Sequence, residues 1–212
     1  MFEGKSVLEI FRMGGVTLVI LLFMSILSTT IILYKILEFW KKNKVNRKEF
    51  IASIISKLKR GDYNAAINLC DRTISPMAPV AKAGIEARYE NRPDIGETMQ
   101  REIAIETINL EKFTAILGSI GGVAVYVGLY GTVLGIIRSF NDMSVSGSGG
   151  VEIVIAGVAK ALITTAGGLV VAVPAVVAFN LLSKTIDKFV IDMQYCASCL
   201  EEFTRNFKEE QK

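Results

Sequence analysis

Two stretches of this 212-residue chain decide its fold: FTAILGSIGGVAVYVGLYGTVLGII at residues 113–137, and IVIAGVAKALITTAGGLVVAVPAVVAFNLLS at residues 153–183. The first carries no charged residue, and Lys160 alone interrupts the second. At a helical rise of about 1.5 Å per residue, each is long enough to cross a hydrocarbon core of about 30 Å. A third uncharged run extends from Met13 to Tyr34. The sequence therefore predicts an all-α polytopic membrane protein with three transmembrane helices, over residues 13–34, 113–137 and 153–183.

The run at residues 13–34 has one alternative interpretation, a secretory signal peptide. Its apolar stretch is longer than the core of a typical signal peptide, and no small-residue cleavage site precedes the basic cluster that follows it. We therefore expect it to remain as the first span.

The composition of the chain argues against several classes of protein. A net charge of +3 is too small to indicate nucleic-acid binding. The three cysteines, Cys70, Cys196 and Cys199, are an odd number, which does not favour a disulfide framework. The spacing of Cys196 and Cys199 matches half of a zinc site, but the chain has no histidine, so we expect no metal and no other cofactor. We interpret the two cysteines as small residues one helical turn apart, with a redox pair as the alternative.

The basic residues predict the orientation of the spans. Only Lys5 and Arg12 precede the first span. Six basic residues follow directly after it: Lys35, Lys41, Lys42, Lys44, Arg47 and Lys48. Because basic residues accumulate on the cytoplasmic side, residues 1–12 are expected in the periplasm and residues 35–112 in the cytoplasm. Residues 138–152 then form a periplasmic loop, and residues 184–212 a cytoplasmic C-terminal helix.

The expected cytoplasmic segment contains short helices. Apolar residues at helical spacing start near Phe50 and stop at Gly61, and a second short helix is predicted over residues 62–70. Prolines then break the pattern over residues 73–79. From Pro93 onward no strong helix breaker follows, which predicts one continuous helix into the second span. The third span is likewise expected to continue as an amphipathic helix, and residues 141–150 as a short flexible connector.

Small residues and hydroxyls share a face on each of the two later spans. Their spacing of threes, fours and sevens forms two stripes: Gly121, Gly128, Thr132 and Gly135 on one span, and Ala161, Thr165, Gly168 and Ala172 on the other. Small residues let membrane helices approach closely, so the stripes predict packing against a partner helix. The two threonines either bond to a carbonyl one turn back on their own helix or line a pore.

Three further features concern charge and shape inside the bilayer. Pro174 is expected to kink the third span. Lys160 is either functional or near enough to the outer end of its span to extend its ammonium to water. No aspartate or glutamate lies within any expected span. If an ion is coupled to work, the titrating group must therefore come from another chain.

Two motifs resemble one family. GLYGTVLGI at residues 128–136, followed by Ser139 and Phe140, resembles the second-span signature of the ExbB and TolQ family. GVAKALITTAGGL at residues 157–169, with VPAV at residues 173–176 and Phe179-Asn180 after it, resembles the third-span signature. The runs GDY at residues 61–63 and SPMA at residues 75–78 resemble its small cytoplasmic domain. The chain is thus similar to this proton-channel family over nearly its whole length.

The resemblance implies a homopentameric ring whose second and third spans enclose a pore. A dimer of a single-span ExbD- or TolR-like partner would lie inside and supply an aspartate. Thr132 and Thr165 would be the pore-facing hydroxyls on the ion path, and proton passage would energise a TonB- or TolA-like protein spanning the periplasm. MotA-type stators are similar but have four spans, so three spans favour ExbB or TolQ, in a bacterial inner membrane.

One position departs from the family pattern. Lys160 stands where the family usually has glutamate, so a salt bridge to the partner or to a neighbouring subunit is expected there rather than proton relay. The rival hypothesis is an oligomeric membrane scaffold that conducts nothing. An enzyme is not expected, because the chain has no histidine and no cluster of nucleophile and base. Neither the choice between ExbB and TolQ nor that between protons and sodium ions follows from the sequence.

Overall fold

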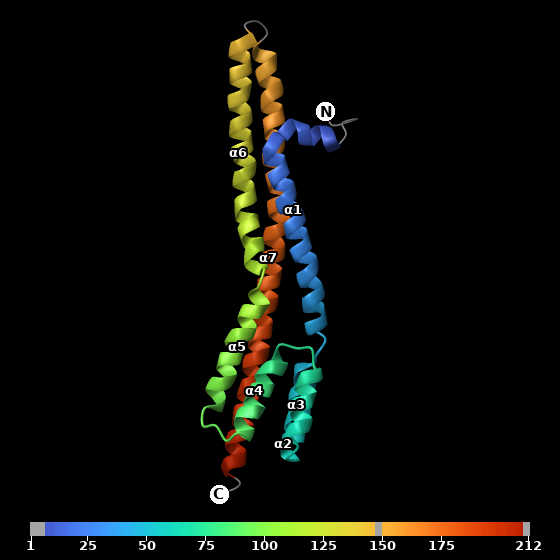
Figure 1. The fold of residues 1–212 in the computed structure, drawn as a ribbon, viewed down its shortest axis with the longest axis vertical. Coiled ribbons are helices and arrows are strands. Elements are labelled where there is room, and N and C mark those ends of the chain that lie inside the picture. The colour runs from blue at the N-terminus through green and yellow to red at the C-terminus, as the bar shows by residue number, and fades with distance from the viewer. Residues whose placement is uncertain (1–6, 147–149, 210–212) are drawn as a thin grey trace. The chain divides into compact units, whose positions relative to one another are not determined.

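The computed structural model describes residues 7–146 and 150–209, and within them every regular element is an α-helix. The helices, shown in Figure 1, are α1 Val7–Lys42, α2 Arg47–Lys59, α3 Tyr63–Arg72, α4 Met77–Tyr89, α5 Ile95–Glu111, α6 Thr114–Ser146 and α7 Gly150–Glu209. The chain divides into two compact units. The first comprises residues up to Leu33 together with Phe113–Leu181, and the second comprises Tyr34–Lys112 together with the residues from Leu182 onward. The predicted all-α fold is confirmed.

The first unit is built from three helices, each long and apolar enough to cross a membrane: α1, α6 and the first part of α7. Gly15 interrupts α1 with a backbone conformation of φ 58° and ψ −149°, in the left-handed region that glycine tolerates. Beyond it, α1 packs on α6 and α7 through a shared apolar core: Leu18, Leu21, Ile120, Ala124, Val171, Ala172 and Ala175.

The outer surface of this unit is apolar. Large side chains stand exposed on all three helices, among them Phe23 on α1, Tyr126 and Tyr130 on α6, and Val170 and Val173 on α7. Soluble monomers rarely expose apolar surface on this scale. The three helices are therefore suited to a hydrocarbon environment, as their composition predicts.

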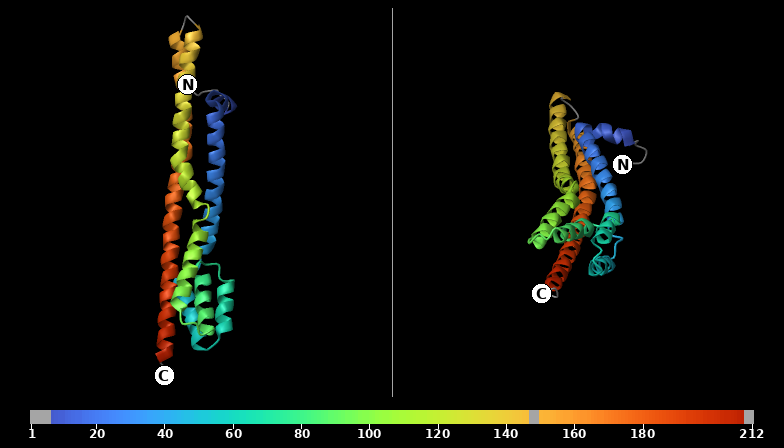
Figure 2. Two further views of the ribbon diagram at one scale, coloured as in Figure 1. Left: turned by 60° about the vertical axis from the view of Figure 1, so that its left-hand side comes forward. Right: turned by 60° about the horizontal axis from the view of Figure 1, so that its bottom comes forward.

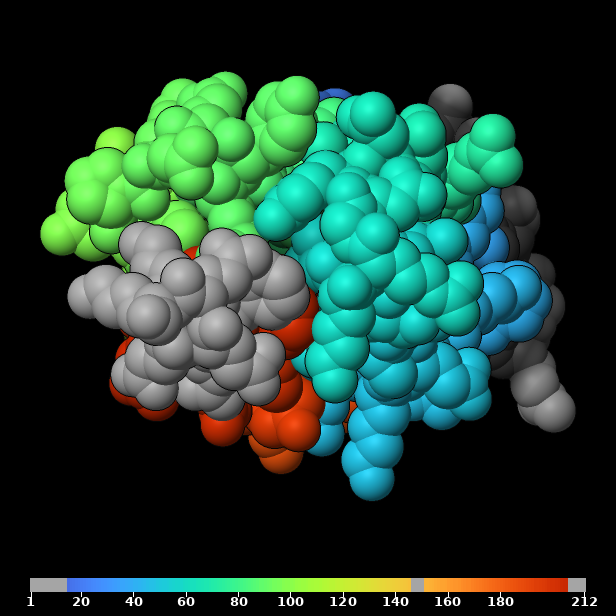
Figure 3. Space-filling view, turned by 90° about the horizontal axis from the view of Figure 1, so that it is seen from below, coloured from blue at the N-terminus to red at the C-terminus, as the bar shows by residue number. Residues whose placement is uncertain are grey.

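The second unit is a bundle of the end of α1, helices α2 to α5 and the last part of α7 (Figure 2). Figure 3 views this bundle end on, with α2 to α5 in blue to green and part of α7 in red along the lower edge. Asp62 caps α3 by accepting a hydrogen bond from the Ala65 amide at 2.9 Å. Gly61, with φ 73°, makes the turn before it, so the predicted stop at Gly61 and the short helix after it are confirmed.

The last part of α7 supplies an apolar face to this bundle. Its buried residues recur at threes and fours, as predicted for an amphipathic helix: Leu182, Ile186, Phe189, Met193, Cys196, Ala197 and Leu200. Phe189 meets Phe39 of α1 edge to face, with ring centroids 5.6 Å apart. The three cysteines are free, with Cys70 and Cys196 buried and Cys199 half-buried.

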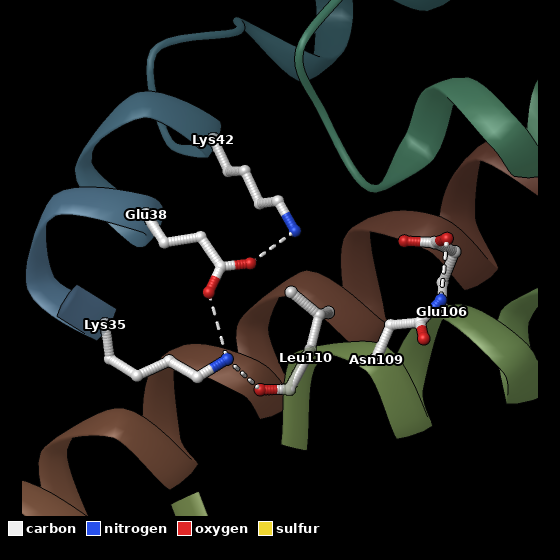
Figure 4. Close-up of polar contacts among 6 residues, drawn as sticks. All are labelled: Lys35, Glu38, Lys42, Glu106, Asn109 and Leu110. Carbon is white, nitrogen blue, oxygen red and sulfur yellow. Dashed lines mark hydrogen bonds and ion pairs between the residues drawn. The ribbon is translucent and has the colours of Figure 1, made fainter. Parts of the chain in front are cut away.

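The prediction of one continuous helix from Pro93 into the second span is wrong. Helix α5 ends at Glu111, Phe113 has a φ of 68°, and α6 begins at Thr114. The reason lies in α1, where the ammonium of Lys35 donates a hydrogen bond to the Leu110 carbonyl at 3.0 Å (Figure 4). A continuous helix would use that carbonyl for its own next turn, whereas here a side chain distant in sequence satisfies it.

Lys35 itself is held in place by further contacts. It is buried to 1% exposure and pairs with Glu38 at 3.0 Å, and Glu38 also pairs with Lys42 at 2.8 Å. The ring of Phe39 lies 5.2 Å from the Lys35 nitrogen. A cation at the C-terminal end of α5 also complements the partial negative charge of that helix end.

The connector between the second and third spans is shorter than the expected 141–150. Helix α6 remains helical through Ser146 and α7 begins at Gly150, while residues 147–149 lie outside the described residues. Helix α7 passes through Pro174 as one continuous helix to Glu209. The expected kink at Pro174 stays a prediction.

Candidate functional site

Helices α6 and α7 of the first unit approach each other closely at Gly128 and Gly168. A methyl group added to Gly128 would lie 2.7 Å from the Thr164 carbonyl oxygen and 3.1 Å from the Gly168 Cα. A methyl group added to Gly168 would lie 2.7 Å from the Ala124 carbonyl oxygen. Both obstacles are backbone atoms, so only glycine permits this crossing.

The other residues of the predicted stripes continue this seam along the same two helices. A methyl group at Gly135 would lie 2.6 Å from the Ala161 Cβ, and one at Gly121 would meet the Val176 side chain. Ala172 is buried in the core of the unit. In this structure the stripes thus pack α6 against α7 of the same chain, and packing against a helix of another protein stays a prediction.

The two threonines that the stripes single out lie together at the seam. The hydroxyls of Thr132 on α6 and Thr165 on α7 form a direct hydrogen bond. Thr132 is also within 3.2 Å of the Gly128 carbonyl and 3.3 Å of the Ala161 carbonyl. Thr132 is buried and Thr165 is half-buried. Thr132 thus bonds to a carbonyl one turn back on its own helix, which is one of the two alternatives left by the sequence, and the lining of a pore by these threonines stays a prediction.

A third hydroxyl, which the sequence analysis did not single out, belongs to the same cluster. Thr164 donates to the Ala161 carbonyl at 2.7 Å or the Gly128 carbonyl at 3.1 Å, and its oxygen lies 3.4 Å from that of Thr132. The signal was available, because Thr164 lies three residues after Ala161 and four before Gly168, on the same face of the helix. The Gly128 carbonyl is thus within reach of three hydroxyls, since Thr165 lies 3.4 Å from it.

The chemistry of this cluster is that of a neutral, polar site in apolar surroundings. Each hydroxyl can donate one hydrogen bond and accept two, so the cluster can solvate a proton-carrying or cationic group. It cannot itself take up a proton near neutral pH. Among the described residues no group of histidine, cysteine, aspartate or glutamate is placed to hold a metal ion.

A pocket of about 380 Å³ opens next to the hydroxyl cluster, within the first unit. Residues of α1, α6 and α7 line it, including Thr17, Gly131 and Thr164. Lys160 lies on its wall with an exposed side chain, and the expected salt bridge to another chain stays a prediction.

Residues 72–195, which include the cluster, the seam and part of the second unit, match the MotA/TolQ/ExbB proton channel family. The chain belongs to this family. Together with the three apolar helices, this membership makes it a multi-pass membrane protein. The family is one of channel and motor subunits rather than of catalysts.

Several relatives carry the names ExbB and TolQ. The chain is 28% identical to an ExbB homolog of Methanothermobacter thermautotrophicus over 86% of this chain and 64% of that protein. It is 38% identical to the biopolymer transport protein ExbB of Pseudomonas putida over 50% of this chain and 30% of that protein. It is 39% identical to the Tol-Pal system protein TolQ of Haemophilus influenzae over 63% of this chain and 53% of that protein. The chain therefore spans from under a third to just under two thirds of these relatives.

A solved structure has the same fold. A chain of the Campylobacter jejuni MotAB structure superposes with a TM-score of 0.60 and 16% sequence identity, over 96% of this chain and 82% of that chain. At this identity the likeness concerns the fold alone.

Proposed function

We propose that this chain is the ring-forming, ion-conducting subunit of an ExbB-ExbD or TolQ-TolR type motor in a bacterial inner membrane. The observation that carries the proposal is the cluster of Thr132, Thr164 and Thr165 at a glycine seam in an otherwise apolar unit. Burying polar groups in a membrane helix pair is costly unless they are satisfied, and packing alone does not require three hydroxyls.

In this proposal the chain provides the walls of the ion path and another protein provides the acid. The expected spans contain no aspartate or glutamate. A dimer of a single-span ExbD- or TolR-like protein would supply the carboxylate, and a homopentamer of this chain would surround it. Half-buried Thr165 is the hydroxyl best placed to reach such a carboxylate, with Thr132 and Thr164 behind it. Ion passage would energise a TonB- or TolA-like protein that spans the periplasm.

The topology in this proposal has the N-terminus in the periplasm. The second unit, which holds most of the chain's charged residues, would lie in the cytoplasm as extensions of the second and third spans. The basic residues after the first span support this orientation.

The proposal is tested by proton flux into vesicles that contain the chain and its single-span partner. Thr165→Val and Thr132→Val remove one hydroxyl each at nearly constant volume, and each should abolish flux while the complex still assembles. The matched control is Thr30→Val, because Thr30 is exposed on α1 and bonds only to its own helix, to the Ile26 carbonyl at 2.8 Å. Full flux in both cluster variants would refute the ion path.

The alternative function is an oligomeric membrane scaffold. It predicts that vesicles with the assembled complex show no flux under any ion gradient, and that all three threonine variants behave alike. Repeating the assay with a sodium gradient in place of a proton gradient would identify the coupled ion.

A further inference from the structure

Two basic side chains of the first unit line one pocket. In its described side chains, residues 15–33, 113–145 and 151–181, the only arginine or lysine residues are Arg138 and Lys160. They come from different helices, α6 and α7, and both are among the residues that line the pocket of about 380 Å³. Both are exposed, and neither has an ion-pair partner among the described residues. Two cations facing the same cavity indicate an anionic ligand.

The pocket has walls of small residues and hydroxyls. Gly131, Gly135, Ala156, Gly157 and Ala161 leave the space that larger side chains would fill. A methyl group at Gly157 would collide with the Ser139 side chain, so a larger residue does not fit at position 157. The break of α1 at Gly15 lies beside Arg138, whose guanidinium would be 3.9 Å from a methyl group at that glycine.

The net charge of the lining fits a singly charged ligand. Asp142 lies on the same wall and is engaged in an interaction of its own. Among the described lining residues, two cations and one carboxylate leave a net charge of about +1, which matches the single negative charge of a phosphodiester. An arginine guanidinium presents a planar fork of donors to phosphate oxygens, and lysine contributes a compact charge.

The pocket lies at the end of the uncharged run 113–137. Arg138 directly follows the uncharged run 113–137, and exposed apolar side chains stand on all three helices nearby: Val16, Ile137, Phe140 and Ile155. Lys160 lies deeper in its span, but side chains on a helix lean toward its N-terminus, which for α7 is the end near Arg138. In the topology expected from the sequence, the end of this run lies at the depth where lipid headgroups meet acyl chains.

We propose that this pocket binds the phosphate group of a membrane phospholipid, with Arg138 and Lys160 as its ligands and the neighbouring apolar side chains along the acyl chains. The proposal rests on membrane insertion and on the pocket, and not on the proposed motor function. In this proposal the lipid phosphate, rather than a second protein, is the anionic partner of Lys160.

The test is native mass spectrometry of the purified chain in neutral detergent, titrated with phosphatidylglycerol. Diacylglycerol with the same acyl chains serves as the lipid without phosphate. Arg138→Gln and Lys160→Gln should each weaken phosphatidylglycerol binding about fivefold, from roughly 1 kcal/mol for each basic residue near a charged lipid surface. Lys160→Arg should retain binding. Lys184→Gln, which removes an exposed lysine outside the first unit, is the matched control and should change nothing.

Each contrary outcome has a definite meaning. Equal binding by the wild type and both glutamine variants, or equal binding of diacylglycerol, would overturn the proposal. Binding of inorganic phosphate without binding of phospholipid would replace the lipid with a free anion. The isolated chain could bind the lipid while the complex with the single-span partner does not. That result would assign the pocket to a carboxylate of the partner and would also overturn the proposal.

Discussion

Gly128→Ala tests the close approach of α6 and α7. The added methyl group would lie 2.7 Å from the Thr164 carbonyl oxygen, and ordinary contact begins near 3.4 Å. The obstacle is backbone, so the helices must separate locally by about 0.7 Å, a gap that loses roughly a quarter to a half of each contact's attraction. Overpacking of this kind costs about 1–3 kcal/mol.

The same displacement would disturb the hydroxyl cluster. The Thr164 oxygen lies 3.1 Å from the Gly128 carbonyl, and a shift of about 0.7 Å would take the pair beyond hydrogen-bond range. We therefore expect Gly128→Ala to lower both thermal stability and ion flux, although it removes no polar group.

The assay is thermal unfolding of the purified protein in detergent, with Gly122→Ala as the control. Gly122 is on the same helix, and a methyl group added to it would have no atom within 4 Å. Gly128→Ala should lower Tm by roughly 2–12 °C, whereas Gly122→Ala should leave it within about 2 °C. Equal Tm values for the two variants would refute the steric reasoning.

Three further predictions concern the second unit. Lys35→Met should destabilise the protein by about 1–3 kcal/mol in thermal unfolding, because it leaves the Leu110 carbonyl without its donor, whereas Lys41→Met on the exposed face of α1 should have no effect. Burial raises the pKa of the Cys70 thiol to about 12. A maleimide at pH 8 should therefore not label Cys70 in the folded protein, and should label it after unfolding. Labelling of Cys70 in the folded protein would contradict its burial. Asp62→Ala should cost about 1 kcal/mol by removing the cap of α3, and denaturant unfolding with an unchanged midpoint would show that the cap contributes nothing.

The spans could be predicted from sequence because their signals are local. Uncharged length identified three apolar helices, and the spacing of glycine, alanine and threonine identified the faces along which α6 and α7 pack. Thr164 was missed because Thr165 beside it satisfied the same spacing. Which hydroxyl lies deeper depends on how the two helices are rotated against each other, and one helix's periodicity does not contain that information.

The break at Phe113 could not be predicted in the same way. No glycine or proline lies at residues 111–114, and local propensity favours a helix that continues. The break is stabilised by Lys35, a residue distant in sequence that takes the carbonyl of Leu110. A long-range contact thus overrides local preference, which is a limit of any argument from a single segment.

The carbonyl of Gly128 has a consequence for how mutational data on this protein will be understood. It belongs to the main chain, so no exchange of side chains can delete it. A saturation screen would report position 128 as intolerant for steric reasons, and it would not detect the contribution of the carbonyl oxygen itself. Replacing the amide nitrogen of Leu129 by an ester oxygen through chemical synthesis would weaken that acceptor without adding bulk, and would separate what the atom contributes from the space it occupies.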